Sequence, residues 1–506
     1  MTTLFSKLQY QLDTLGMYRT VTLALLALAV CSLVFSLIGL LPYTFLELAL
    51  SLVASVALAL LINVLLARVL RIAANHESAI ITALILFFLF LPPQSTEEWF
   101  YYLIAITVAV ASKFVLVWQK QHVFNAAALG AVFVSLPYFL EAPWWVATPV
   151  LFIPLLIAGL AVVAKIRKWE LVGSFVLVAL IVFVIEELRF GNTPIDAVTT
   201  FFLSWPALFL AFFMLTEPFT MPGTKQKQVI YGALVGFLSS TALFTPVFAM
   251  TPELALVIGN LIMFPFTLRQ KLFLTFIEKR EIAANTWEFV FEKPPGMQFR
   301  SGQYLEWMLP HKGSDTRGPR RYFTIASGPS EEQLRLAVRI ESEQGSSYKQ
   351  ALAALEPGEH IIASQRAGDF MLPQDINQKL AFVAGGIGVT PFSSHLAEMA
   401  ATGEWQDSVL YYCNNVGADI AYQDRFQSYT EGNPFSLVHV LAKEEVPGYE
   451  HGYLTDEIIT LHTPDYVERL WYLSGPPGMV NAYYSLLRKM GVARRNIKRD
   501  FFPGLA

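Results

Sequence analysis

Three short segments in the C-terminal half of the chain carry residue types that suit nucleotide phosphates. They are residues 320–327 (RRYFTIAS), 384–391 (AGGIGVTP) and 473–479 (LSGPPGM). An arginine guanidinium matches phosphate oxygens, and glycines before a helix let backbone amides approach a pyrophosphate. A single glycine-rich turn is weak evidence. The three segments in this order nevertheless favour a flavin in one domain and a nicotinamide nucleotide in the next.

Two predicted domains position these segments. Residues 271–376 contain alternating runs typical of the strands of a small antiparallel β-barrel that binds FAD. The runs are residues 272–280, 286–292, 304–309, 322–326, 334–340 and 360–364. Residues 377–506 predict an α/β, Rossmann-like NAD(P)-binding domain. In that domain the strands 379–384 and 469–473 each lead into a glycine-containing turn and then a helix.

Residues 321–324 (RYFT) resemble the FAD signature of the ferredoxin–NADP reductase superfamily, which is an arginine, any residue, an aromatic and then Ser or Thr. The resemblance implies that Arg321 pairs with the FAD pyrophosphate and that Phe323 packs on the isoalloxazine ring. It also implies that the Thr324 hydroxyl reaches flavin N5. Family members often have Tyr at the position of Phe323, and phenylalanine keeps the stacking while losing a hydroxyl.

The same resemblance marks two further positions beside the reacting rings. Ser474 stands where the superfamily frequently has Cys next to the nicotinamide, so hydride transfer is expected to be modestly slower. Near the C-terminus, Asp500 and Phe502 resemble the terminal segment whose aromatic residue covers the flavin, although Leu505 replaces the usual last aromatic. The predicted catalytic residues are therefore Phe323, Thr324, Ser474 and Phe502.

Cofactor contacts are predicted for FAD and for NADH or NADPH. For FAD they are Arg321, Tyr322, Phe323, Thr324, Val338, Gly345, Ser346 and Ser347, the last three preceding a helix-like segment at 348–355. For the nicotinamide nucleotide they are Gly385, Gly386, Gly388, Thr390, Pro391, Gly475, Pro476, Gly478 and Met479. The choice between NADH and NADPH stays open. Residues 411–415 lack the basic side chain that often holds a 2′-phosphate, but Arg425 could reach that position.

The first 270 residues are apolar enough for a lipid bilayer. The whole chain of 506 residues is 54% hydrophobic and 15% charged, and most of the charge lies after residue 270. About 20 apolar residues cross a bilayer, and ten spans are predicted in this transmembrane domain, several of them short. The spans are residues 17–41, 44–67, 78–92, 98–118, 126–140, 145–164, 170–187, 197–216, 228–248 and 252–268.

Basic residues divide unevenly between the two sides of these spans. With a cytoplasmic N-terminus, the outer connections hold Arg189 alone. The inner flanks hold Lys7, Arg19, Arg68, Arg71, Lys120, Lys165, Arg167, Lys168, Lys225, Lys227, Arg269 and Lys271. Lys113 falls within a predicted span and is left out. Because Lys and Arg favour cytoplasmic loops, we expect a multi-pass protein of the inner membrane of a prokaryote, with both termini in the cytoplasm.

The residue content argues against several other classes of protein. A net charge of −4 and a pI near 6.1 favour no nucleic-acid partner. Cys31 and Cys413 cannot hold an iron–sulfur cluster, and a disulfide between them is not expected. Only His76 and His122 precede residue 300, both at predicted cytoplasmic ends, so no haem is expected in the membrane domain. No metal site is predicted.

Three polar segments interrupt the apolar runs: residues 75–82 (NHESAIIT), 122–130 (HVFNAAALG) and 215–224 (LTEPFTMPGT). On composition alone they are either cytoplasmic loops with helix caps or broken backbone that lines a cofactor or ion site. Together with residues 231–236 (YGALVG), they resemble the family of the B subunit of sodium-translocating NADH:quinone reductase and the D subunit of Rnf complexes (NqrB/RnfD). This resemblance implies a fold of ten helices in two related halves that binds flavin within the membrane.

The resemblance also implies FMN contacts in the membrane domain, for which we predict Thr82, Asn125, Thr199, Thr200, Thr216, Glu217 and Thr220. In that family FMN is attached to a threonine through a phosphoester. The matching outer loop here, residues 192–202, has an Asp and two threonines, but the acceptor position falls on Phe202. Covalent FMN, non-covalent flavin and a lost flavin all stay open. Thr199 and Thr200 are equally suited to cap a helix.

The sequence therefore predicts a membrane NAD(P)H dehydrogenase or flavin reductase. Electrons would pass from cytoplasmic NAD(P)H through FAD to a flavin in the membrane domain, and then to a quinone or to a flavin or flavoprotein outside the cytoplasm. One alternative is a redox-driven transporter of Na⁺ or H⁺, with Glu47, Glu186 and Glu187 as candidate intramembrane acids. Another is a membrane-anchored diaphorase whose helices serve only as a tether.

Overall fold

The computed structural model describes residues 16–70, 74–118, 121–136, 139–241, 244–245, 248–267, 271–311, 313, 319–340 and 346–500. The chain divides into two compact units between Arg269 and Gln270, named here the N-terminal unit and the C-terminal unit. This division lies where the predicted transmembrane domain ends. Within the C-terminal unit, the strands of one sheet end at Ala367 and those of a second begin at Leu380, on either side of the predicted boundary at residue 376.

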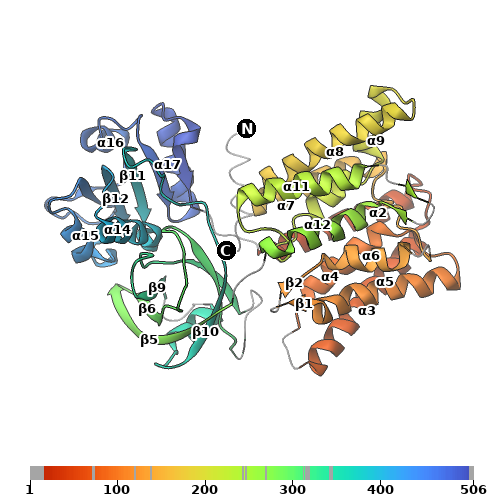
Figure 1. Ribbon diagram of the computed structural model, residues 1–506, viewed down its shortest axis with the longest axis horizontal. Coiled ribbons are helices and arrows are strands. Elements are labelled where there is room, and N and C mark those ends of the chain that lie inside the picture. Colours follow the sequence, from red (N-terminus) through yellow and green to blue (C-terminus); the bar gives the residue numbers. More distant parts are fainter. Residues whose placement is uncertain are drawn as a thin grey trace. The chain divides into compact units, whose positions relative to one another are not determined.

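Helices make up most of the described N-terminal unit (Figure 1). They are α2 (Met17–Leu37), α3 (Phe45–Val69), α4 (His76–Leu89), α5 (Thr96–Val115), α6 (Ala126–Ser135), α7 (Phe152–Ile166), α8 (Trp169–Arg189), α9 (Pro194–Leu203), α10 (Ala207–Phe209), α11 (Lys225–Ser240) and α12 (Pro252–Thr267). A π-helical turn, η2 (Leu210–Met214), continues α10. Every predicted span contains at least one of these helices.

Among the residues that the structure describes, five helical segments are long and apolar enough to cross a bilayer: α2, α3, α5, α8 and Pro149–Ile166, which includes α7. The predicted span 197–216 is not one straight helix. Its parts, Pro194–Leu203 and Ala207–Met214, meet at a bend of 49°, and Pro206 between them cannot supply a helical N–H. Helices α4, α6 and α12 have 14, 10 and 16 residues, fewer than a straight crossing needs. The unit therefore has several helices suited to a membrane, and the number ten stays a prediction.

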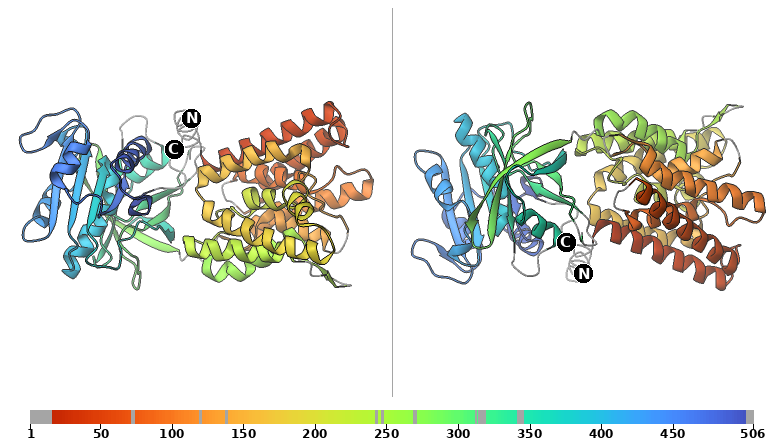
Figure 2. Two further views of the ribbon diagram at one scale, coloured as in Figure 1. Left: turned by 90° about the horizontal axis from the view of Figure 1, so that it is seen from above. Right: turned by 90° about the horizontal axis from the view of Figure 1, so that it is seen from below.

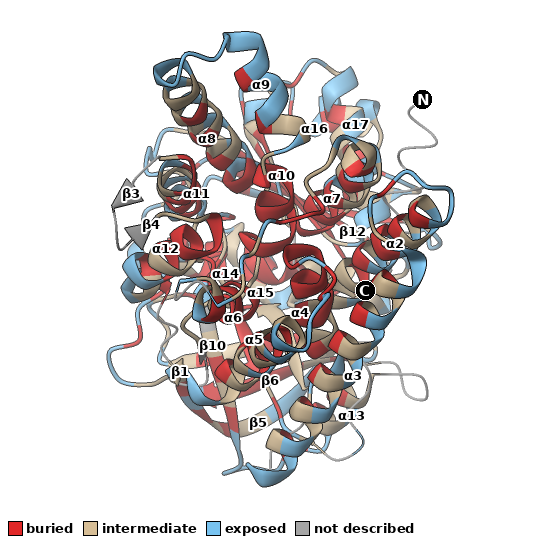
Figure 3. Cartoon of the chain, turned by 90° about the vertical axis from the view of Figure 1, so that its right-hand side faces the viewer, coloured by how far each residue is buried: buried red, intermediate tan, exposed pale blue. Residues whose placement is uncertain are grey.

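Small residues let the helices of this unit pack closely. An added Cβ on Gly232 or Gly236 of α11 would lie 2.5 Å from Leu171 O or 2.7 Å from Phe175 O of α8. Such small-xxx-small patterns bring helix backbones together in a bilayer, where apolar side chains gain little by clustering. Figure 2 shows the resulting side-by-side helices. In Figure 3, buried residues lie on their inner faces and exposed ones on their outer faces, while α10 is buried throughout.

Six antiparallel strands form the first sheet of the C-terminal unit, in the order β8-β7-β10-β5-β6-β9. They are β5 (Leu272–Ala283), β6 (Thr286–Glu292), β7 (Tyr304–Met308), β8 (Arg320–Thr324), β9 (Gln333–Arg339) and β10 (His360–Ala367). Each lies within three residues of a predicted run, which confirms the strands of the barrel. Large apolar side chains fill its core, including Phe289, Phe291 and Trp307. A short helix, α13 (Ser347–Ala353), precedes β10.

The second sheet is parallel, in the order β14-β13-β12-β11-β15-β16 (Figure 1). Its strands are β11 (Leu380–Gly385), β12 (Ser408–Asn414), β13 (Phe435–Leu441), β14 (Glu450–His451), β15 (Leu470–Ser474) and β16 (Ile497–Arg499). The connecting helices include α14 (Thr390–Thr402), α15 (Gln423–Tyr429), α16 (Asp456–His462) and α17 (Pro477–Lys489). The chain builds outward from β11 to β14 and then returns to β15 on the other side of β11. Ligands of such sheets bind at this switch point, beyond the carboxyl ends of the strands.

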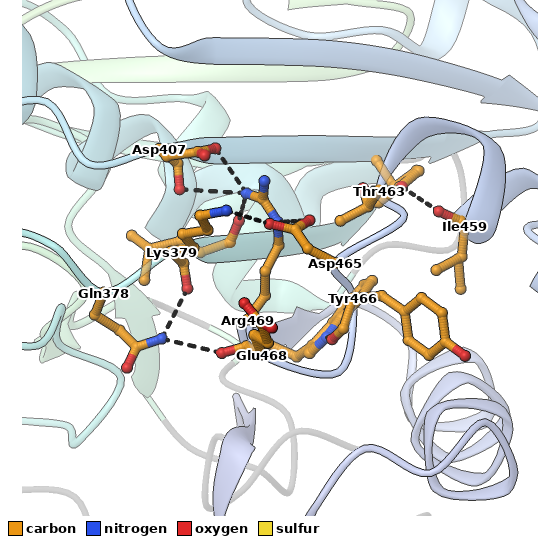
Figure 4. A network of polar contacts seen from close by, with 12 residues as sticks. Gln378, Lys379, Asp407, Ile459, Thr463, Asp465, Tyr466, Glu468 and Arg469 are labelled. Carbon is orange, nitrogen blue, oxygen red and sulfur yellow. Dashed lines mark hydrogen bonds and ion pairs between the residues drawn. The ribbon is translucent and has the colours of Figure 1, made fainter.

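A polar cluster ties three strands together at their amino ends (Figure 4). The buried Arg469 guanidinium donates to Asp407 Oδ1 and to Asp465 Oδ1, both at 2.8 Å, and to Leu380 O at 3.0 Å. Lys379 Nζ donates to Asp465 Oδ2 at 2.6 Å. Lys379, Asp407 and Arg469 lie directly before β11, β12 and β15, respectively. The cluster therefore holds together the ends of these central strands that lie opposite the switch point.

Candidate nucleotide and flavin sites

The two glycine turns of the parallel sheet lie against each other. They follow β11 and β15, which are neighbouring strands. A Cβ on Gly388 would lie 2.6 Å from Gly475 Cα and 2.7 Å from Ser474 O, and a Cβ on Gly385 would lie 2.4 Å from Met479 Sδ. Gly475 also has a φ of 150° and Gly386 one of 52°, which glycine adopts most easily. Backbone from both turns therefore meets at the carboxyl end of the sheet.

Helices begin directly after both turns. Thr390 and Pro391 open α14, and Pro477 opens α17 with Gly478 and Met479 in its first turn. Proline suits the first helical positions because its missing N–H is not needed there. The free amides and partial positive charge of a helix start suit a pyrophosphate. The structure thus brings together the nine residues predicted for the nicotinamide nucleotide: Gly385, Gly386, Gly388, Thr390, Pro391, Gly475, Pro476, Gly478 and Met479.

Ser474 contacts the last described residue of the chain. Its hydroxyl donates to Asp500 Oδ2 at 3.1 Å, and Asp500 N donates to Leu473 O at 2.9 Å. The terminal segment is therefore held beside the turn where the nicotinamide is expected. Phe502, predicted to cover the flavin, lies outside the described residues.

Strand β8 carries the predicted FAD signature on an edge of the barrel sheet. The Arg321 guanidinium lies over the ring of Tyr348 at 5.2 Å, and the rings of Phe323 and Tyr348 are 6.0 Å apart. Trp307 Nε1 donates to Phe323 O at 3.2 Å, and Thr324 is buried. Arg321 and Phe323 share a face because side chains alternate along a strand. The two residues predicted to grip the pyrophosphate and the ring therefore lie together.

The alternate face of β8 is held by a buried carboxylate. Tyr322 Oη donates to Glu306 Oε2 at 2.8 Å, and Arg320 Nη1 lies 3.1 Å from Glu306 Oε1. Glu306 is only 4% exposed. Tyr322 therefore anchors the strand from the face opposite Phe323.

The remaining predicted FAD residues lie around α13 and in the barrel. Ser346 caps the helix by accepting from Lys349 N, and Ser347 Oγ is 2.9 Å from His311 Nε2. Val338 is buried in the barrel core. Gly345 lies outside the described residues.

Burial keeps several titratable groups of the C-terminal unit neutral. It lowers the pKa of His395 on α14 to about 3 and raises the pKa of the Cys413 thiol to about 12. Burial also raises the pKa of Tyr348, and the positive charge of the nearby Arg321 offsets only part of this rise. Cys413 is therefore a neutral thiol at physiological pH, without the thiolate that cysteine chemistry requires.

Comparisons with known proteins agree with this geometry. A family model described as an oxidoreductase NAD-binding domain matches residues 382–484, from β11 into α17. The reductase subunit of an aromatic O-demethylase from Amycolatopsis is 28% identical over 235 residues, covering 45% of this chain and 68% of that protein. The C-terminal unit is an NAD(P)H-dependent flavoprotein oxidoreductase domain. It is called the reductase unit below.

Two other relatives also match only part of the chain. The F subunit of an Na⁺-translocating NADH-quinone reductase from Haemophilus influenzae is 27% identical over 205 residues, covering 36% of this chain and 48% of that protein. A flavohemoprotein from Xylella fastidiosa is 25% identical over 221 residues, covering 41% and 52%. The chain thus spans about half the length of these two relatives. Because one of them is a haem protein by name, the expected lack of haem in this chain stays a prediction.

A pocket lies within the N-terminal unit. It is bordered by the starts of α2, α4 and α6, the ends of α5 and α7, and the segment after η2. Its polar lining residues are Ser78, Thr82, Lys113, Asn125, Thr216 and Glu217, and its apolar ones include Ile81, Ile85, Val162, Ile166 and Phe213. Every one of these helix ends is cytoplasmic in the predicted topology.

Four of the seven residues predicted to hold a membrane flavin line this pocket: Thr82, Asn125, Thr216 and Glu217. Thr220 is buried next to them, with its hydroxyl 3.4 Å from Glu217 O. Thr199 and Thr200 are exposed on α9 and do not line the pocket. Lys113 and Ser78 were not predicted. A charged residue within an apolar span is the signal that could have identified Lys113.

Asn125 fastens the wall of the pocket. Its side chain accepts from Ala128 N at 3.0 Å, which caps α6, and donates to Met214 O at 3.1 Å, at the end of the π-helical turn. Its backbone N–H donates to Asn260 Oδ1 at 2.8 Å, and Asn260 Nδ2 donates to Tyr231 Oη at 2.6 Å. This buried network joins α6, α11, α12 and η2.

The predicted intramembrane acids lie at helix ends. Glu47 completes the capping box of α3, Glu186 pairs with Arg189, and Glu187 accepts from Asn192. Glu253, which was not predicted, is 1% exposed and accepts from Ser135 Oγ at 3.0 Å and from Trp144 Nε1 at 3.1 Å. The contacts of Glu47, Glu186 and Glu187 are local, whereas Glu253 joins the start of α12 to Ser135 and Trp144, which are distant in sequence.

Proposed function

We propose that the protein is a membrane NAD(P)H dehydrogenase. Electrons pass from cytoplasmic NAD(P)H through FAD in the reductase unit to a flavin in the pocket of the N-terminal unit. From there they pass to a quinone, or to a flavin or flavoprotein outside the cytoplasm. The protein lies in the cytoplasmic membrane of a prokaryote with both termini inside. The observation that carries the proposal is a largely apolar pocket with convergent polar side chains at predicted cytoplasmic helix ends, in the same chain as a flavoprotein reductase.

The character of the pocket supports a bound ring. Small-molecule sites are mostly apolar and contain a few convergent polar groups. The pocket has this kind of lining. It also lies where the short helix α4 and the broken helix α9–η2 come together. These are the third elements of two successive sets of five, and interrupted helices at corresponding positions of two halves often mark a binding site.

The relatives support the pairing of the two units. The reductase unit is similar to the F subunit of an Na⁺-translocating NADH-quinone reductase. Independently, the polar segments of the N-terminal unit resemble the B subunit of that kind of complex. The two units of this chain are thus similar to two subunits of one kind of electron-transferring complex. This favours electron transfer between the two units of the chain over a membrane unit that serves only as a tether.

The residues of the reductase unit have separate roles in this proposal. A flavin supplies the chemistry of accepting a hydride and releasing single electrons. The two glycine turns hold the nucleotide pyrophosphate, and β8 orients the flavin through Arg321, Phe323 and Thr324. Ser474 and Asp500 lie beside the expected nicotinamide and fix its position. The apolar wall of the N-terminal pocket keeps water from the second flavin.

Flavin analysis of the purified full-length protein tests the proposal. We expect two flavins per chain: FAD and a second flavin, released by extraction or retained covalently. Inverted membrane vesicles with an acceptor trapped in their lumen should then oxidise NAD(P)H faster than vesicles without it. One FAD per chain and no reduction of quinone or trapped acceptor would contradict the proposal and favour an anchored diaphorase.

A further inference from the structure

Lys113 supplies a positive charge to the pocket from within an apolar helix. It lies in the last turn of α5, and its ammonium donates to Ser78 O at 2.7 Å, to Ser78 Oγ at 2.8 Å and to Thr82 Oγ1. All three acceptors are neutral oxygens of α4. A cation within apolar spans is costly, so such residues usually mark a functional site.

The carboxylate of the pocket does not neutralise Lys113 by direct pairing among the described contacts. Glu217 acts on Lys113 electrostatically, but its own ion-pair contact is His122, at 3.9 Å. Its Oε2 atom is buried without a hydrogen-bond partner in the part of the chain that the structure describes. Lys113 and Glu217 both line the pocket, and one carboxylate oxygen of Glu217 has unused acceptor capacity.

This combination discriminates between redox rings. The pyrimidine edge of an isoalloxazine has two carbonyl acceptors with an N–H donor between them, so it complements a cation and a carboxylate together. A quinone ring has carbonyl acceptors only and would leave the Glu217 oxygen unsatisfied. Phe213 and the isoleucines of α4 provide apolar contact for a flat ring.

We infer that Lys113 is the electrostatic partner of the pocket flavin and raises its reduction potential. This inference rests on the proposed function. Reduced FAD gives up two electrons and two protons and is oxidised, and the pocket flavin takes up the electrons. Until protons from water reach the pocket flavin, each electron adds negative charge to it. A neighbouring ammonium stabilises that charge more than it stabilises the oxidised, neutral ring.

The test compares two variants of the full-length protein in detergent. Lys113→Gln removes the charge and keeps a hydrogen-bond donor, whereas Lys113→Arg keeps the charge. Lys225→Gln is the matched control, because Lys225 is exposed on α11 and pairs with Glu170 outside the pocket.

The readouts are the content of the second flavin and its midpoint potential in a spectroelectrochemical titration. For Lys113→Gln we expect the equilibrium constant for reduction to fall at least tenfold, about 59 mV for a one-electron couple. Lys113→Arg and Lys225→Gln should stay close to the parent protein.

Each outcome decides the matter. An unchanged potential in Lys113→Gln overturns the inference, as does loss of the second flavin from both Lys113 variants, because shape rather than charge would then matter. Loss from Lys113→Gln alone supports it. If Lys113→Gln does not fold, Ser78→Ala removes a hydrogen bond and leaves the ammonium; a tenfold fall there would overturn the inference, and a parent-like potential supports it. A parent protein that carries FAD alone contradicts the proposed function itself.

Discussion

The nucleotide site of the reductase unit is built from backbone, whereas the pocket of the N-terminal unit is built from side chains. In the reductase unit, Gly385, Gly388 and Gly475 approach so closely that a Cβ at any of them would meet a neighbour at 2.7 Å or less. In the N-terminal unit, the polar lining comes from helix ends spread between Ser78 and Glu217. Both sites lie where separate segments of chain converge.

The two constructions predict different responses to substitution. A site made of backbone has no spare volume, so a single methyl group displaces main chain on which several contacts depend. A pocket made of side chains loses one contact at a time, and its neighbours can compensate. A single substitution should therefore cause a large loss of function at the nucleotide site of the reductase unit and a smaller loss at the pocket of the N-terminal unit.

Gly388→Ala should have the largest effect on activity. The new methyl would meet Gly475 Cα, Gly475 N and Ser474 O at 2.6–2.7 Å, and none of these backbone atoms can rotate away. We expect NAD(P)H oxidation with an artificial acceptor to fall about 10²-fold, in line with the cost of small displacements at a reacting site, while FAD remains bound. Gly417→Ala is the control, because its Cβ would meet only Glu444 Oε2, at an ordinary 3.5 Å. Near-normal activity in Gly388→Ala would show that the backbone of the two glycine turns can move apart to accept a methyl group. It would contradict the proposed difference in tolerance between the two units.

Arg469→Met should destabilise the reductase unit by about 3 kcal/mol, because it leaves Asp407 and Asp465 without their common partner. The arginine is far along the strands from the glycine turns, so it tests whether the backbone site depends on the sheet behind it. Denaturant unfolding of the full-length protein, monitored through flavin release, measures the effect. Lys379→Met removes a more exposed partner of Asp465 and should cost less.

The effect of Arg469→Met should depend on pH. Burial alone would raise the pKa of Asp465, but hydrogen bonds from Arg469 and Lys379 lower it to about 2 from an ordinary 3.8. A carboxylate with a lowered pKa stabilises the fold fully above the unfolded value and loses this contribution as the pH falls through the folded value. The stability difference between the parent and Arg469→Met should therefore shrink between about pH 4 and pH 2. A difference that stays constant over this range would show that Asp465 is not the partner that matters.

Backbone sites leave marks in a sequence that side-chain pockets do not. The glycine turns were predictable because only glycine fits there, and the barrel strands because their side chains alternate in a regular way. Arg321, Phe323 and Thr324 were predictable from one short pattern on β8. By contrast, Thr82, Asn125, Thr216 and Glu217 were suggested by a resemblance, and only the folded helices show that they line one pocket.

Sequence reasoning did not place several other residues, for similar physical reasons. Lys113 looked like an isolated charge within a span, because its partners on α4 are more than 30 residues away. Thr199 and Thr200 are exposed on α9 and do not line this pocket, so their role in holding a flavin stays a prediction. Glu253 was missed because a lone acid at a helix start does not reveal that Ser135 and Trp144 bury it.

Asn125→Ala should have an intermediate effect, confined to the N-terminal unit. It removes both the cap of α6 and the hydrogen bond to Met214 O, so we expect affinity for the second flavin to fall about tenfold. Asn125→Ser keeps an oxygen that can cap the helix and should lose less. The measurement is flavin content after dialysis, with reductase activity towards an artificial acceptor as the internal reference. Asn192→Ala, at an exposed position of the opposite helix ends, is the control. Complete loss of the flavin from Asn125→Ser would mean that this pocket is as intolerant as the glycine turns.

Ser474→Ala should have the smallest effect, because it changes a side chain within a site made of backbone. It removes one hydrogen bond, from the Ser474 hydroxyl to Asp500 at 3.1 Å, while leaving the Ser474 carbonyl that Gly388 packs against. We expect the rate of FAD reduction in a single anaerobic turnover to fall about threefold, the size of a modest hydrogen bond, with nucleotide affinity unchanged. Ser474→Cys, which places the superfamily's frequent residue beside the expected nicotinamide, should reduce FAD at least as fast as the parent. A fall of 100-fold or more in Ser474→Ala would place the hydroxyl in the reaction itself. Substituting a side chain in the reductase unit would then reduce activity as strongly as substituting one of the glycines.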